Sequence, residues 1–167
     1  MTTHAGPPPR PTKDEVEALL AACQVLVGIS AQSMAAVSDV ADLIQVRALV
    51  VVAGRGSVSL SELASAMDIH LTRASRLCDR LVLKGLLHRA DDPANRRQLI
   101  LTLTPSGRRV TRTVIQRRRA ALGPILSRMT NKLSEQQRGE FTSLLRSFAT
   151  AAGQPSDTDL WAMGWAT

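Results

Sequence analysis

The chain has 167 residues, of which 44% are apolar, so it can bury a real hydrophobic core within one domain and does not have a disordered composition. Its two cysteines are too few for the disulfide framework of a small secreted protein. The formal net charge is +7, and residues 69–119 alone carry 13 Lys or Arg against 3 acids, which favours an acidic partner for that part of the chain.

No targeting signal is expected at the N-terminus. Residues 1–11 are rich in proline and small residues, and we expect a disordered tail there. They lack the apolar core of a signal peptide, and the longest strongly apolar run, at residues 48–53, is too short to span a bilayer. These features predict a cytoplasmic protein with no membrane partner.

Two helices are expected next. Thr12 and Glu15 have the spacing of a capping box, and apolar residues at helical spacing follow, which predicts a long helix over about residues 13–37. The segment from residue 43 to Gly54 contains three consecutive valines that would also suit a strand. The spacing of its apolar residues and the glycines after it favour a short buried helix.

Residues 59–103 have the order helix, turn, helix, hairpin. Ser59 and Glu62 form another capping box and open a short helix, and a second helix follows from Leu71 to a stop at Gly85. Residues 86–89 and 98–103 then predict two strands joined by a turn. This order is typical of a helix-turn-helix followed by a wing.

Two more helices complete the chain. Thr104 and Pro105 are typical of the N-cap and first residue of a helix. Ser134 and Gln137 cap a last helix that bears apolar residues on one face. Residues 153–167 form a C-terminal tail with no recognisable pattern.

The second helix of a helix-turn-helix lies in the DNA major groove with its N-terminal residues at the base edges. In this chain the side chains expected to read DNA bases are Thr72, Arg73, Ser75 and Arg76. His70, at the start of the helix, is expected to contact a phosphate. The competing interpretation is a solvated amphipathic helix. The hairpin that follows and the arginine content favour DNA, because arginine suits bidentate contacts with guanine and phosphate.

Residues 71–107 resemble the MarR (multiple antibiotic resistance regulator) family of winged helix-turn-helix regulators. The resemblance rests on four short stretches at the family's spacing: Asp79-Arg80-Leu81, Lys84-Gly85-Leu86, Asp92-Pro93-Ala94-Asn95-Arg96-Arg97 and Leu103-Thr104-Pro105-Ser106-Gly107. It implies a mainly α fold with a two-stranded β wing, and N- and C-terminal helices that form a dimerisation region.

The resemblance also implies roles for the wing. Arg96 and Arg97 would stand at the wing tip, and at least one of them would enter the minor groove or hold its phosphates; the alternative is two solvated charges on a turn. Asn95 occupies a position where the family has an aspartate that holds the wing arginine. We therefore expect the remaining acids near the wing to take over part of that support: Asp79, Asp91 and Asp92.

The expected organisation is a disordered tail at 1–11, a helical dimerisation region at 12–38 and 105–152, a winged helix-turn-helix at 39–104 and a C-terminal tail at 153–167. The family implies a homodimer on a palindromic operator in double-stranded DNA. It also implies a small effector, which the apolar residues of the flanking helices predict to be apolar or aromatic.

Two alternative functions remain open at this point. Cys23 could make the protein a redox-switched repressor, although its place on the apolar side of a helix favours an ordinary core cysteine, as for Cys78. A winged-helix protein-interaction module without DNA binding is the other alternative, and the charge of residues 69–119 argues against it.

Enzymatic activity is not expected. The sequence contains no glycine-rich phosphate loop and no nucleophile elbow, and therefore no catalytic residues are assigned. His4, His70 and His88 lack the spacing of metal ligands, so neither a metal nor another cofactor is predicted.

Overall fold

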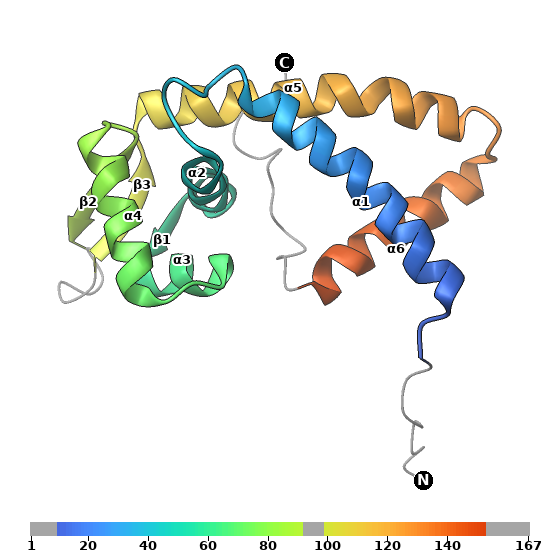
Figure 1. The fold of residues 1–167 in the computed structure, drawn as a ribbon, viewed down its shortest axis with the longest axis horizontal. Helices are drawn as coiled ribbons and strands as arrows, with labels where there is room; N and C mark the ends of the chain where they lie inside the picture. Colours follow the sequence, from blue (N-terminus) through green and yellow to red (C-terminus); the bar gives the residue numbers. More distant parts are fainter. Residues whose placement is uncertain (1–9, 92–98, 153–167) are drawn as a thin grey trace, which may run out of the picture.

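The computed structural model describes residues 10–91 and 99–152. Helices dominate the fold (Figure 1). In chain order the elements are α1 (Lys13–Met34), α2 (Leu43–Arg55), β1 (Ser57–Ser59), α3 (Leu60–Met67), α4 (Leu71–Leu83), β2 (Leu87–Asp91), β3 (Leu99–Leu103), α5 (Pro105–Thr130) and α6 (Glu135–Ala151).

The helix starts follow the capping signals in the sequence. The predicted capping boxes at Thr12, Ser59 and Ser134 are all present, with both of their hydrogen bonds. Thr104 caps α5, whose first residue is a proline. A further capping box, formed by Asp42 and Gln45, opens α2 and was not predicted. The helical prediction for residues 43–54 is thereby confirmed over the strand alternative.

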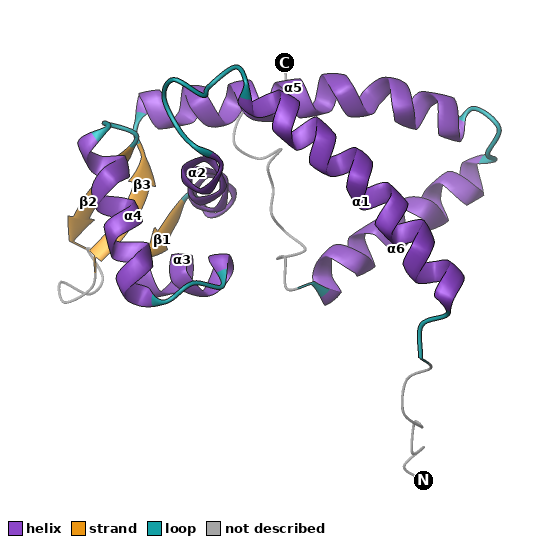
Figure 2. Ribbon diagram, in the orientation of Figure 1, coloured by secondary structure: helices purple, strands orange, loops and turns teal. Residues whose placement is uncertain are grey.

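The sheet has three strands rather than the two expected. Its order is β1-β3-β2, and both pairs are antiparallel. In β1, Val58 lies opposite Leu101 of β3, and both are buried. β1 has only three residues, too few for an alternating pattern to be visible, and its last residue, Ser59, also caps α3. Figure 2 shows the strands at one end of the molecule, beside α4.

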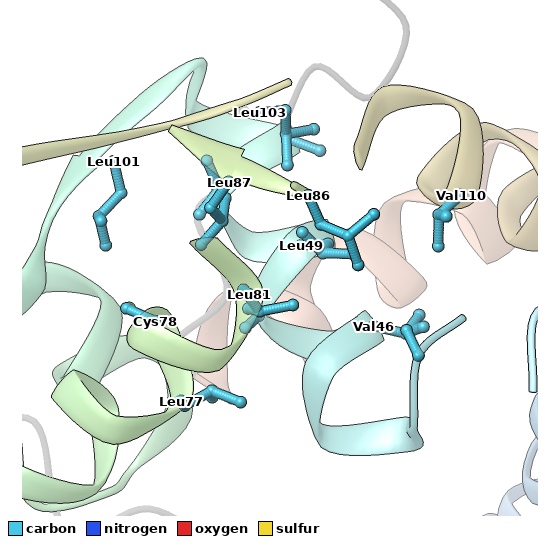
Figure 3. Close-up of a cluster of buried hydrophobic side chains, with 14 of the residues drawn as sticks. Val46, Leu49, Leu77, Cys78, Leu81, Leu86, Leu87, Leu101, Leu103 and Val110 are labelled. Carbon is cyan, nitrogen blue, oxygen red and sulfur yellow. The ribbon is translucent and has the colours of Figure 1, made fainter. Parts of the chain in front are cut away.

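One core lies between α2, α3, α4, the sheet and the first half of α5. The side chains that Figure 3 labels converge on it from all of these elements except α3, including Leu49 of α2, Leu81 of α4 and Val110 of α5. Full burial of a leucine or valine contributes about 1.5–3 kcal/mol relative to exposure. This core therefore holds the helix-turn-helix, the wing strands and the start of α5 together as one body.

The remaining helical surface is only partly covered. The buried residues of α5 end at Ile115, and α6 has none. Large apolar side chains are exposed on α1 and α6, including Leu20, Val27, Leu144 and Phe148. Since α1 packs against α5, these helices form a second region beside the core, with an apolar surface that this single chain does not bury.

Among the described residues, α1 is the one helix whose length and composition would let it cross a membrane. The length of the longest apolar run, residues 48–53, does not reveal α1, because the apolar residues of α1 are spread along the helix rather than consecutive. Such a composition is also found in helices that pack against other helices, as α1 does against α5.

Candidate nucleic-acid interface

Helix α4 begins at His70, whose ring caps it. The Nδ1 atom of His70 accepts a hydrogen bond from the backbone N–H of Thr72 at 3.3 Å and lies 3.1 Å from the Thr72 hydroxyl. An accepting Nδ1 places the ring proton on Nε2 in the neutral ring, which leaves an N–H donor that the cap does not use. His70 is exposed, so that donor faces solvent at the helix start.

The buried residues of α4 define its outward face. They are Ala74, Leu77, Cys78 and Leu81. On a helix of 3.6 residues per turn, Thr72 and Arg76 lie opposite this buried side, and both are exposed. Arg73 lies on the flank that faces α2, and half-buried Ser75 lies on the other flank. The structure thus brings two of the four predicted side chains together at the centre of the outward face.

The wing is tied to α4 by an ion pair. Arg89 of β2 donates from Nη1 to Oδ1 of Asp79 at 3.2 Å. Such an exposed pair contributes only about 0.2–1 kcal/mol, so its main effect is to orient β2 against α4. Among the described residues, the partner of Asp79 is thus an arginine in the wing strand β2.

The wing tip itself lies outside the described residues. The predicted contacts Arg96 and Arg97, and the predicted supports Asp92 and Asn95, all fall within residues 92–98. Asp91 is the last residue of β2 and is exposed. The strands on either side of that segment, β2 and β3, pair antiparallel from Leu87–Leu103 to Asp91–Leu99.

The C-terminal end of α4 is anchored by a residue that sequence reasoning did not single out. Lys84 donates from Nζ to the carbonyl oxygen of Val40 at 2.9 Å and to Oε1 of Gln45 at 2.8 Å. Gln45 is buried and belongs to the capping box of α2. Lys84 therefore fixes the end of α4 to the segment that joins α1 and α2, about forty residues earlier in the chain.

A second attachment joins the same end of α4 to α5. The Thr104 hydroxyl donates to the carbonyl oxygen of Gly85 at 2.6 Å, and the Thr104 N–H donates to that of Leu86 at 3.2 Å. Gly107, in the first turn of α5, packs directly against the Leu86 carbonyl. Gly85 adopts a φ of 65°, which a glycine accommodates without strain. Residues 84–86 thus form a junction between α4, the α1–α2 segment and α5.

A cavity of about 780 Å³ lies between α1, α2 and α5. Its walls are mainly apolar, and they include Leu26, Met34 and Val51. Arg118 of α5 reaches into this region and donates from Nε to Oγ of Ser33 at 3.2 Å. Burial lowers the pKa of the Arg118 guanidinium from its ordinary value. The cavity therefore combines an apolar lining with a partly desolvated cation, and the sequence had not identified its residues.

The two cysteines differ in environment. Cys78 is buried on the core-facing side of α4, as expected, and desolvation raises the pKa of its thiol to about 11. Cys23 is exposed in this chain and lines the apolar cavity, so the interpretation of Cys23 as a core cysteine is wrong for the single chain. The reason is that the apolar side of α1 at Cys23 is not covered by another element.

This contrast predicts the outcome of a thiol titration. At pH 8 the folded protein should react with a disulfide reagent at no more than one thiol per chain, because burial and the raised pKa of Cys78 keep that thiol unreactive. Unfolding should release the second thiol. A Cys23→Ser variant that still reacted quickly when folded would contradict the burial of Cys78.

No group of three or more His, Cys, Asp or Glu side chains that could hold a metal ion occurs within residues 10–91 and 99–152.

Comparison with known proteins gives a consistent result. Residues 38–98 match the family model described as "MarR family". Over 77 residues the chain is 30% identical to the HTH-type transcriptional regulator YsmB of Bacillus subtilis. The matched region covers 46% of this chain and about half (53%) of that protein. The crystal structure of RV1404 from Mycobacterium tuberculosis matches with a TM-score of 0.68 and 32% identity, covering 87% of this chain and 98% of the other. A MarR family regulator from Silicibacter pomeroyi shares the fold, with a TM-score of 0.62 at 21% identity over 85% of this chain and 96% of that one.

Proposed function

This chain belongs to the MarR family of transcriptional regulators, and we propose that it is a repressor that binds a palindromic operator in double-stranded DNA as a homodimer. The observation that carries the proposal is the outward face of α4. Thr72 and Arg76 are exposed there, at the N-terminal half of the second helix of a helix-turn-helix. That half of the helix is the part that meets base edges in the major groove.

The proposed contacts divide into two groups. Thr72, Arg73, Ser75 and Arg76 read base edges, with Thr72 and Arg76 at the centre of the outward face. A second group contacts the DNA backbone and the minor groove without reading bases directly: His70, Arg96 and Arg97. For His70 the support is the Nε2 donor that the cap leaves unused at the start of α4.

Dimerisation is proposed through residues 12–38 and 105–152, with residues 39–104 as the DNA-binding domain and residues 1–11 and 153–167 as tails. The support is the exposed apolar surface of α1 and α6, including Leu20 and Phe148. A second copy would cover that surface and place two recognition helices on one duplex, as two half-sites require.

We propose that a small apolar or aromatic effector releases the repressor from DNA. The cavity between α1, α2 and α5 supports this, because its volume of about 780 Å³ lies in the usual range for small-molecule sites. The cavity also lies between the dimerisation helices α1 and α5 and helix α2, whose N-terminus is held by Lys84. Arg118, together with Arg47, supplies the charged groups of the cavity that orient such a ligand.

The test is selection of binding sequences from a random duplex pool at about 0.15 M salt, where non-specific binding is suppressed. A palindromic consensus is expected from a protein with twice the chain mass by light scattering. An Arg76→Ala variant should bind that consensus more weakly by about 1–3 kcal/mol for each half-site and accept other bases at one position of each half-site.

Arg128→Ala is the matched control, because this exposed arginine lies in the last turn of α5, far along the chain from α4. Arg96→Ala and Arg97→Ala should weaken binding to all duplexes and reduce its salt dependence. Unchanged affinity and sequence preference in Arg76→Ala, with the control also unchanged, would refute the base-reading role of Arg76.

The alternatives make different predictions in the same assay. A redox-switched repressor would lose its operator on oxidation and keep it in a Cys23→Ser variant; the exposure of Cys23 is the observation that favours testing this. A protein-interaction module would remain dimeric and enrich no sequence.

A further inference from the structure

Four arginines surround a cleft between α2 and α4. They are Arg47 of α2 and Arg73, Arg76 and Arg80 of α4. The cleft has a volume of about 380 Å³, and its remaining lining is apolar, formed by Ile44, Met67, Ile69 and Leu77. We call it the arginine cleft. Two of its arginines, Arg47 and Arg80, belong to none of the proposed DNA contacts.

These arginines are not neutralised within the described part of the chain. None of the four side chains forms a hydrogen bond or an ion pair with a described residue. In contrast, Arg89 and Arg118 each have a side-chain partner. On α4 the spacing of Arg73, Arg76 and Arg80 places like charges three and four residues apart, which destabilises an isolated helix. The free protein thus concentrates uncompensated positive charge at one site.

We propose that the arginine cleft binds a backbone phosphate of the DNA at the edge of the major groove that α4 occupies. The proposal rests on the DNA-binding function proposed above. Arg47 and Arg80 are its new residues, and their role is to hold the phosphate rather than to read a base. A guanidinium suits this role because its planar donors bind phosphate oxygens in pairs.

The position of the cleft favours DNA over a free anion. Arg73 and Arg76 connect it to the outward face of α4, so a duplex that meets Arg76 brings its backbone to the cleft mouth. The apolar lining supports the aliphatic stems of the arginines and offers no side-chain acceptor that would compete with the phosphate for their N–H donors. The contact also joins α2 to the DNA, whereas the DNA contacts proposed above come only from α4 with its cap and from the wing.

The test is the salt dependence of DNA binding. Affinity for the selected consensus and for an unrelated duplex is measured between about 50 and 200 mM salt for the wild type, Arg47→Gln and Arg80→Gln. Each variant should lower the slope of log K against log salt by about 0.9 for each phosphate that the protein no longer neutralises, and so by about 1.8 for a dimer. Both duplexes should weaken by the same factor, because a phosphate contact carries no sequence information.

Two further variants make the result specific. Arg55→Gln is the matched control, since Arg55 is an exposed arginine in the last turn of α2 and does not line the cleft. It should keep the wild-type slope. Arg80→Lys should keep most of the wild-type slope that Arg80→Gln loses, because lysine keeps the positive charge. If the role of Arg80 were purely structural, the lysine and glutamine variants would not differ in slope.

The outcomes separate the two proposals. A wild-type protein that binds no duplex refutes the DNA-binding function itself. A wild type that binds DNA, with unchanged slopes in Arg47→Gln and Arg80→Gln, refutes the cleft. If inorganic phosphate binds the wild type but not Arg47→Gln in the absence of DNA, while the DNA slopes of Arg47→Gln and Arg80→Gln equal that of the wild type, the cleft is a site for free anions and the DNA assignment is overturned.

Discussion

Replacing Gly107 by alanine is expected to lower the free energy of unfolding by about 1–3 kcal/mol, the usual cost of overpacking a well-filled site. A Cβ atom at position 107 would fall far inside the contact distance of the Leu86 carbonyl oxygen, and within 3.4 Å of Leu103 Cδ2. The first of these atoms is backbone and is held by its hydrogen bond from Thr104, so it cannot rotate away. Either α5 or residues 84–86 must shift, and DNA binding should weaken as well.

Gly139→Ala provides the control for this prediction. Gly139 lies inside α6, and outside its own helix backbone and chain neighbours no atom lies within 4 Å of the position its Cβ would take. Alanine there should raise the free energy of unfolding by about 0.5–1 kcal/mol, because alanine favours a helix interior over glycine. Urea denaturation of both variants measures whether each substitution raises or lowers the free energy of unfolding. A Gly107→Ala protein as stable as the wild type would mean that α5 does not contact the Leu86 carbonyl.

Leu81→Ala is expected to cost about 2–5 kcal/mol, the range for a leucine removed from a packed core. Leu81 is 0% exposed and packs in the centre of the core beneath α4 (Figure 3). The loss should appear in thermal and urea unfolding. It should also weaken DNA binding, since α4 would lose the packing that fixes its outward face.

The matched control is Leu83→Ala, two residues further along the same helix. Leu83 is 87% exposed, so its removal leaves no cavity and should change the free energy of unfolding by no more than about 0.5 kcal/mol. Equal losses from the two leucines would contradict the orientation of α4. A stable Leu83→Ala protein with weakened DNA binding would add Leu83 to the interface.

The sequence predicted most of the fold because its local signals agree with each other. Capping boxes at Thr12, Ser59 and Ser134, the Thr104-Pro105 start and the stop at Gly85 each mark a helix end by hydrogen bonds or backbone geometry within a few residues. The periodicity of α4 was likewise sufficient to separate its buried leucines from Thr72 and Arg76. These are short-range features that a single sequence contains in full.

The features that sequence reasoning missed depend on partners far along the chain. Nothing near Lys84 indicates that it binds Val40 and Gln45, which lie 44 and 39 residues earlier. Strand β1 is recognisable only from its pairing with β3. The exposure of Cys23 and the arrangement of Arg47 beside Arg80 likewise depend on how α1 and α2 pack, which periodicity alone does not specify.

The junction at residues 84–86 makes α4 a lever with its pivot at the C-terminal end. From Lys84 to Thr72 the helix extends for about 18 Å, so a tilt of about 10° at the pivot moves the outward side chains by about 3 Å. That displacement is as long as a hydrogen bond and is enough to break a base contact. The pivot is held by the Val40 carbonyl and by Thr104, which lie next to the helices that enclose the cavity. A movement of those helices too small to disturb the core would thus be magnified at the DNA.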